Sequence, residues 1–195
     1  EWTALTITKR SDAGVSMHGT LLYGSEPSYY LNVLSHAGSS EMKIAEVVPS
    51  NTDFIIDITI GNITSYIKAY RNYLDSKSSL DRYEAILKAQ KKEFGQNAEE
   101  WAESLGINEV AVLNLKMNGK LRQILTLRPG KKLKAENVSG MKCAGFASSV
   151  FGNVFTAEDE STCALAHGWI VIGAADCVAE YSKTKPFSES LWRLL

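Results

Sequence analysis

The stretch from residue 53 to residue 76 constrains the fold of this chain more than any other part of the sequence. Large apolar residues occupy alternate positions in its first half, namely Phe54, Ile56, Ile58 and Ile60. This two-residue period is typical of a half-buried β-strand, whose successive side chains point to opposite faces of a sheet. Gly61-Asn62 then interrupts the pattern and ends the predicted strand.

An amphipathic helix is predicted to follow at once, over residues 62–76. Asn62 is a favourable N-cap residue because its side-chain oxygen can accept a backbone N–H bond from the first turn. Apolar side chains then recur every three or four residues, at Ile63, Tyr66, Ile67, Tyr70, Tyr73 and Leu74. Burying each large side chain contributes roughly 1.5–3 kcal/mol. The helix should therefore fold back over the sheet that contains the strand.

Paired strands are predicted elsewhere in the chain. The strongest local signal is the pair 107–117 and 121–127 around Asn118-Gly119, the dipeptide that a type I′ turn favours. Further pairs are predicted from residues 163–167 with 169–173, and from residues 2–8 with 15–23. Helices are predicted to begin near Glu26, Ser79, Ala174 and Ser188, whereas residues 139–155 favour no element. We therefore expect an α+β fold, a mostly antiparallel β-sheet with helices packed on one face.

The composition is that of an ordinary globular protein. Hydrophobic residues make up 45% and charged residues 22% of the 195 positions. A formal net charge of −1 argues against a protein whose main task is to bind nucleic-acid phosphates. No run approaches the ~18 apolar residues of a membrane span.

The length suits one α+β domain over residues 1–195. Pro129-Gly130 opens a polar linker, so an arrangement of two lobes that meet near residues 129–140 stays open. The sequence begins without an initiator Met and without the pattern of a signal peptide. We therefore expect a fragment of a longer chain.

Cysteine usage predicts neither a disulfide framework nor a zinc site. Cys143, Cys163 and Cys177 form an odd set without CxxC spacing. We expect buried free thiols in preference to one bridged pair.

Catalytic and metal-binding patterns are weak. The sequence contains no GxSxG, P-loop, HExxH or Gly-rich dinucleotide motif. Cys143 with His167 would supply a thiol nucleophile and its base, but no family signature surrounds them, and a structural cysteine is the default. His18 and His36 lack ligand spacing. We therefore predict no catalytic, cofactor-binding or metal-binding residues, and no cofactor.

Charged and aromatic groups offer the remaining candidates. Glu99, Glu100 and Glu103 are predicted to form a solvated helix face rather than an acid–base pair. A tentative binding patch for anionic lipid, lipopolysaccharide or polysaccharide consists of Lys88, Lys91, Lys92, Arg128, Lys131, Lys132 and Lys134. The alternative is that these cations serve solubility and helical pairs such as Glu84 with Lys88. Six tyrosines are predicted to be core, with a sugar-binding platform as the alternative: Tyr29, Tyr30, Tyr66, Tyr70, Tyr73 and Tyr83.

Four stretches resemble an uncharacterised family of bacterial envelope proteins. They are Val47-Val-Pro-Ser-Asn-Thr-Asp-Phe-Ile-Ile, Tyr70-Arg-Asn-Tyr-Leu74, Trp101-Ala-Glu-Ser-Leu-Gly-Ile-Asn-Glu-Val-Ala-Val112 and His167-Gly-Trp-Ile-Val-Ile-Gly173. Members of that family are similar to exported lipoproteins of Gram-negative gut-type bacteria and have no assigned activity. The resemblance spans most of residues 40–183. It implies a place in the cell envelope, in the periplasm or on the outer-membrane surface, with an acylated Cys upstream.

These observations favour a non-enzymatic module of an exported bacterial envelope lipoprotein with a role in surface binding or assembly. Its expected partners are an envelope protein, a polysaccharide, an anionic lipid or other domains of the same chain, and not nucleic acid. Two alternatives remain. One is a hydrolase-type domain whose active site is completed by missing segments, and the other is an architectural repeat unit.

Overall fold

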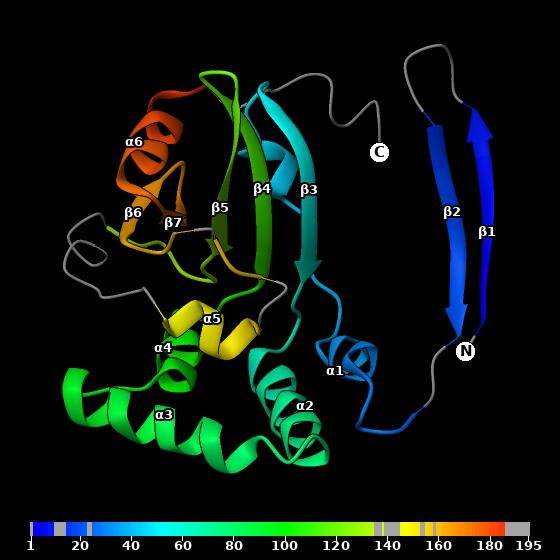
Figure 1. The fold of residues 1–195 in the computed structure, drawn as a ribbon, viewed down its shortest axis with the longest axis vertical. Coiled ribbons are helices and arrows are strands. Elements are labelled where there is room, and N and C mark those ends of the chain that lie inside the picture. Colours follow the sequence, from blue (N-terminus) through cyan, green and yellow to red (C-terminus); the bar gives the residue numbers. More distant parts are fainter. Residues whose placement is uncertain are drawn as a thin grey trace.

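A computed structural model of the chain describes residues 2–9, 15–22, 25–134, 138, 145–152, 155–157 and 159–185, with the backbone alone for 2–9 and 15–22. The elements follow in this order: β1 (Trp2–Lys9), β2 (Val15–Leu22), α1 (Tyr30–His36), η1 (Ile44–Glu46), β3 (Thr52–Thr59), α2 (Ile63–Ser76), α3 (Leu80–Phe94), α4 (Ala98–Leu105), β4 (Glu109–Met117), β5 (Lys120–Arg128), α5 (Phe146–Phe151), β6 (Thr162–Ala166), β7 (Trp169–Gly173) and α6 (Ala175–Lys183) (Figure 1).

The predicted α+β class with an antiparallel sheet is confirmed. Five strands form one sheet in the order β3-β4-β5-β7-β6, and each neighbouring pair is antiparallel. β1 and β2 form a separate two-stranded sheet. Because β5 pairs with β7, chain segments on both sides of residues 129–140 contribute to the same sheet.

The unit at residues 53–76 forms as predicted. β3 runs from Thr52 to Thr59, and α2 begins at Ile63 with Asn62 as its N-cap, whose side-chain oxygen accepts the Ser65 N–H at 2.9 Å. The hairpin between β4 and β5 turns at Asn118 and Gly119, which have φ values of 50° and 75°. Both residues of a type I′ turn need a positive φ, which explains why this dipeptide is favoured there.

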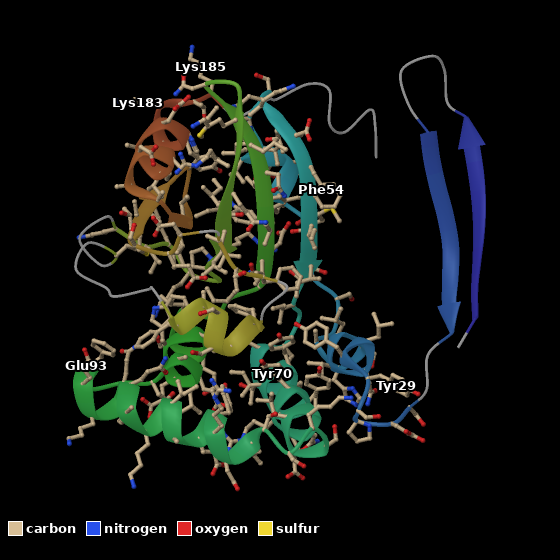
Figure 2. All side chains as sticks on the ribbon, viewed as in Figure 1. Tyr29, Phe54, Tyr70, Glu93, Lys183 and Lys185 are labelled. Atoms are coloured by element: carbon tan, nitrogen blue, oxygen red, sulfur yellow. The ribbon has the colours of Figure 1, made fainter. Side chains whose placement is uncertain are left out.

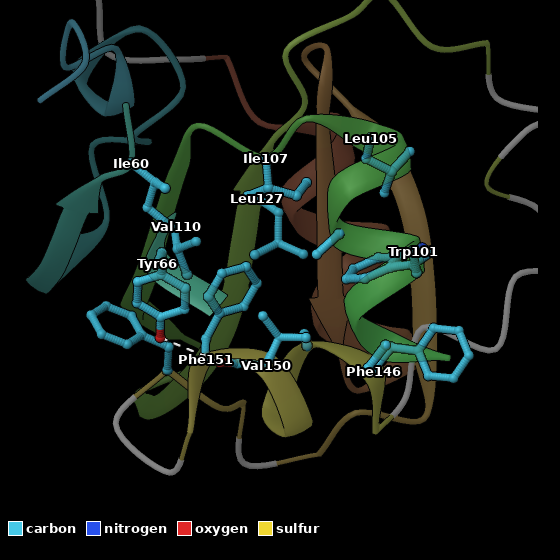
Figure 3. Packing of buried hydrophobic residues seen from close by; sticks show 14 of the residues in the cluster. Ile60, Tyr66, Trp101, Leu105, Ile107, Val110, Leu127, Phe146, Val150 and Phe151 are labelled. Atoms are coloured by element: carbon cyan, nitrogen blue, oxygen red, sulfur yellow. Dashed lines mark hydrogen bonds between the residues drawn. The ribbon is translucent and has the colours of Figure 1, made fainter. Parts of the chain in front are cut away.

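Helices α1 to α5 and one face of the sheet enclose the larger core, which Figure 3 shows from close by. Trp101 of α4 and Tyr66 of α2 are fully buried in it, against Val110 of β4 and Phe151 of α5. The weakly patterned stretch 139–155 thus contains one described helix, α5, which brings Phe146, Val150 and Phe151 into this core. Fully buried side chains of this size contribute the largest share of the driving force for folding.

The opposite face of the sheet is covered as well, by η1 with its neighbours and by α6. Val110 and Val112 of β4 face the larger core, whereas Ala111 and Leu113 face a second cluster. Ile44 and Val48 pack there together with Tyr181 of α6, whose hydroxyl donates to the Val47 carbonyl at 2.8 Å. The helices on one face therefore form the thicker of two covering layers.

One helix start differs from the sequence-based expectation, and one predicted helix is not tested. The first described helix begins at Tyr30 rather than near Glu26. The helix predicted from Ser188 onward lies outside the described residues.

Candidate functional site

Three tyrosines from two helices meet at the open side of the helical layer. The Tyr30 ring of α1 packs edge-to-face on Tyr73 of α2, with centroids 5.6 Å apart, and on Tyr70, with centroids 6.4 Å apart. Tyr70 and Tyr73 lie nearly parallel, at an interplanar angle of 18°. Helical spacing places these two residues on one side of α2, and the packing of α1 against α2 supplies the third ring.

These rings line a cavity of about 340 Å³, within the usual size range for small-ligand sites. The other lining residues are Leu74, Lys77, Ser79 and Gly152. Gly152 has a φ of +72°, and a Cβ atom there would lie 3.2 Å from the Tyr70 hydroxyl. Glycine at this position thus allows the backbone to approach the phenol closely.

A second cavity of about 280 Å³ adjoins the first along Tyr70, Leu74 and Ser79. Two helices line the rest of this second cavity. Helix α3 contributes Arg82, Tyr83 and Ile86, and helix α5 contributes Ser148 and Ser149. The tyrosine cavity, defined here as the space lined by Tyr30, Tyr70 and Tyr73, therefore continues into a neighbouring hollow that bears hydroxyl groups and a guanidinium.

The tyrosine cavity combines neutral phenols with one nearby cation. Burial raises the pKa of Tyr70 to about 12, and burial also raises the pKa of Tyr30 above its ordinary value. Both phenols are consequently protonated at neutral pH. The Lys77 Nζ lies 5.9 Å from the centroid of the Tyr73 ring, a cation–π distance. The cavity thus offers flat apolar faces, hydroxyl donors and a positive charge.

A larger cavity of about 440 Å³ lies between α1 and α2. It is lined by Ser25, Pro27, Asn32, His36, Ser65, Lys68, Ala69 and Asn72. His36 supplies the one aromatic ring among these lining residues, and its Nδ1 already lies 2.7 Å from the Asn32 carbonyl oxygen. Because ligand sites usually combine apolar or aromatic walls with a few polar groups, the tyrosine cavity is the better candidate.

The tyrosine prediction holds in part. Tyr66, Tyr70 and Tyr83 are buried, as expected for core residues, and Tyr29 is exposed. Tyr70 is both a core residue and a wall of the cavity. Sequence spacing alone cannot distinguish these two roles, because the cavity depends on where α1 lies relative to α2.

The structure does not gather the tentative basic patch at one place. Lys91 pairs with Glu100 at the start of α4, at 2.7 Å, whereas Gly130 bonds the Leu105 carbonyl at the end of α4. The α3 lysines and the 131–134 lysines therefore flank opposite ends of a helix that is about 12 Å long. Arg128 does not belong to an exposed patch, since its side chain is 16% exposed and lies 3.1 Å from the Glu109 carboxylate.

The glutamates of α4 connect neighbouring elements. Glu99 pairs with Arg71 of α2 at 3.1 Å, and Glu103 accepts the Thr64 hydroxyl at 2.8 Å. Glu100 completes a capping box with Asn97. Glu84, expected to pair with Lys88, binds Arg71 instead. These contacts explain the carboxylates as links between helices, with no acid–base pair required.

Histidine and cysteine do not converge on a catalytic site in the part of the chain that the structure describes. The Nε2 of His167 lies 3.4 Å from the Tyr181 carbonyl oxygen, and Cys143 lies outside the described residues. Cys163 is disulfide-bonded, so the prediction of a free thiol was wrong there, whereas Cys177 is a buried free thiol as predicted. The described residues contain no group of three His, Cys, Asp or Glu that could hold a metal ion.

A cluster of charged residues lies on the face of the sheet that η1 and α6 cover, and it was not predicted from the sequence. Both oxygens of the fully buried Glu109 accept the Lys43 N–H, at 2.8 and 2.9 Å, and one of them accepts the Ile44 N–H at 2.7 Å. Arg128 completes the arrangement and also donates to the Glu41 carbonyl at 2.7 Å. The cluster fixes the segment before η1 to the sheet, which is a structural role.

Asp57 lies beside this cluster, but no described group donates a hydrogen bond to its carboxylate. It is opposite Ala111 in the β3–β4 register, one diagonal step from Glu109 on the same face. Neither carboxylate oxygen has a hydrogen-bond partner among the described atoms. Burial, and then the negative charge of Glu109, raise the pKa of Asp57 to about 7.

Comparison of the chain with known protein families, curated proteins and solved structures finds no match. Among the described residues, no helix has the length and apolar character needed to span a membrane.

Proposed function

We propose that this chain is a non-enzymatic binding module of an exported bacterial envelope lipoprotein, and that the tyrosine cavity is its ligand site. The observation that carries the proposal is the cavity of about 340 Å³ walled by three tyrosines, with Lys77 and Ser79 at its side. The disulfide at Cys163 supports the exported location, because disulfides persist mainly in oxidising compartments such as the periplasm.

The chemistry of the walls favours a saccharide ligand. Sugar rings present apolar C–H faces that pack on aromatic rings, together with hydroxyl groups that exchange hydrogen bonds with phenols and serines. Ser79, Ser148 and Ser149 supply such groups around the two adjoining cavities. Lys77 would additionally favour a saccharide that carries an acidic substituent.

Isothermal titration of the 195-residue chain with maltoheptaose, chitohexaose and polygalacturonate fragments tests this proposal. We expect binding of at least one of these probes, and a loss of affinity of at least ~10-fold in Tyr73→Ala, which removes one cavity wall. Tyr29→Ala is the matched control, since Tyr29 adjoins Tyr30 in sequence but is 38% exposed and does not line this cavity.

Four results would overturn the proposal. The first is the absence of saccharide binding, and the second is equal weakening by Tyr29→Ala and Tyr73→Ala. The third is release of reducing ends from a probe, which would favour the hydrolase alternative. Binding to phosphatidylglycerol vesicles that Tyr73→Ala leaves unchanged would assign the ligand site to the surface lysines instead.

A further inference from the structure

β3 is an edge strand, with no second described strand paired along its outer side. Within the five-stranded sheet it pairs with β4, and no other described strand pairs with it. A row of unpaired backbone N–H and C=O groups is a template to which another strand can add. The open side of β3 therefore needs a partner or a protective device.

The pairing of β3 with β4 shows which backbone N–H groups of β3 do not bond to β4. Ile60 N–H donates to the Asn108 carbonyl at 2.8 Å, on the side of β4. Alternate residues of a strand direct their backbone groups to opposite sides. The backbone N–H groups of Ile56 and Ile58 thus point toward β4, whereas those of Ile55 and Asp57 point outward.

The sequence of β3 carries only part of the protection that is usual at an exposed edge. Over Thr52–Thr59 it contains neither Lys nor Pro, whereas Asp53, Asp57 and the register shift between Thr52 and Phe54 are features that oppose strand addition. Phe54 is 56% exposed on this strand, and Figure 2 shows its side chain directed away from the body of the sheet. An exposed aromatic residue on an open edge favours association rather than preventing it.

The β1–β2 hairpin is a separate two-stranded sheet whose strands match β3 in length. Its strands pair in unbroken register from Trp2 with Leu22 to Lys9 with Val15, eight residues each, which is also the length of β3. Apolar residues occupy alternate positions of the paired strands, at Leu5, Ile7, Met17 and Leu21. A two-stranded hairpin alone is at best marginally stable in water. Figure 1 shows it apart from the five-stranded sheet, on the side of the open edge of β3.

We propose that the β1–β2 hairpin of one copy adds to the open edge of β3 in a second copy, and that the exchange is reciprocal. A twofold arrangement of this kind would extend each five-stranded sheet by the two strands of the partner copy. Within one chain the hairpin and β3 belong to separate sheets, and no described strand pairs with the outer edge of either. This inference is independent of the tyrosine cavity.

Light scattering after size-exclusion chromatography of the full 195-residue chain tests the exchange, with two matched substitutions. Phe54 and Leu121 are both 56% exposed, but Phe54 is on the edge strand and Leu121 is on the inner strand β5. We expect a dimer for the unmodified chain and for Leu121→Lys. Phe54→Lys should weaken the dimer at least ~10-fold, because a lysine on an edge opposes strand addition.

Ile55→Pro gives a second, backbone-level test. It removes an outward N–H that β4 does not use, so a monomer with an unchanged far-ultraviolet circular dichroism spectrum is expected. A monomeric unmodified chain at every concentration would overturn the proposal. So would a monomer in which the β1, β2 and Ile55 amides resist hydrogen exchange, because the hairpin would then pair within its own chain. A dimer that both edge variants leave intact would place the interface elsewhere.

Discussion

On the face of the sheet that carries α1 to α5, the buried polar atoms near the tyrosine cavity belong to neutral phenols. The opposite face buries the Glu109 carboxylate, with Arg128 and Asp57 partly buried beside it. Tyr30 and Tyr66 share a hydroxyl contact of 3.1 Å, and Tyr30 donates to the Phe151 carbonyl at 3.0 Å. Glu109 is held by two backbone N–H groups and a guanidinium.

The difference separates a binding role from a structural one. A phenol loses little on burial if one partner is present, and it can exchange that partner for a ligand hydroxyl at the edge of a cavity. A buried carboxylate needs its full set of donors, because an unpaired charge in the interior is costly. The phenol side is therefore suited to reversible contacts, and the carboxylate side is suited to holding a segment of chain permanently.

The largest effect is expected for Glu109→Ala. The substitution leaves the Arg128 guanidinium without its carboxylate and the Lys43 and Ile44 N–H groups without acceptors. Breaking one partner of a buried ion pair typically costs ~3–5 kcal/mol. Urea unfolding should report a loss of this size, whereas Glu41→Ala, which removes an exposed partner of Lys43, should cause a much smaller loss. Equal losses for the two variants would contradict the structural role of Glu109.

Asp57 should make stability depend on pH. Its pKa is about 7 in the folded chain and near 3.8 when unperturbed, so the folded chain binds this proton more tightly than the unfolded chain. Protonation therefore stabilises the fold, and the contribution is lost as the pH rises through 7. The shift corresponds to at most ~4 kcal/mol, and partial solvent access reduces it to about 1–3 kcal/mol.

Asp57→Asn checks this dependence, because an amide cannot ionise. Thermal unfolding should show the variant to be more stable than the unmodified chain at pH ~8, less so at pH ~5, and nearly equal to it at pH ~3, below the unperturbed pKa. Asp53→Asn on the same strand is the control, since Asp53 is exposed. A difference between Asp57→Asn and the unmodified chain that stays constant with pH would exclude Asp57 as the titrating group.

The sequence predicts those parts of the fold whose cause is local. The alternation in β3, the Asn62 cap of α2 and the Asn118-Gly119 turn each depend on residues a few positions apart, and all three are confirmed. Charge counting, in contrast, placed Arg128 in a surface patch. Its partner Glu109 lies 19 positions earlier and is held by the backbone N–H groups of Lys43 and Ile44, from a distant segment of the chain. No local pattern contains that information.

The tyrosine cavity is a second case in which sequence reasoning reaches its limit. The spacing of Tyr66, Tyr70 and Tyr73 predicts that they share one side of α2 and that this side packs into the core. The structure shows this side turned inward. Tyr30 comes from α1, about 40 positions earlier, and only the packing of the two helices brings its ring to Tyr73. The signal that could have suggested the cavity is the excess of tyrosine over phenylalanine in the helical core, since a phenol favours a partly wet edge.

The smallest effect is expected for Tyr66→Phe, which removes one buried hydroxyl from the phenol side. This hydroxyl donates to the Val150 carbonyl at 3.3 Å and contacts the Tyr30 hydroxyl, so its loss should cost about 1 kcal/mol in urea unfolding. Tyr30 keeps its bond to the Phe151 carbonyl, which is why the cost stays small. Tyr29→Phe, at an exposed site, should change stability by less than ~0.5 kcal/mol. A loss for Tyr66→Phe as large as that for Glu109→Ala would mean that the phenols form a rigid structural network, and the tyrosine cavity would then be poorly suited to exchange hydrogen bonds with a ligand.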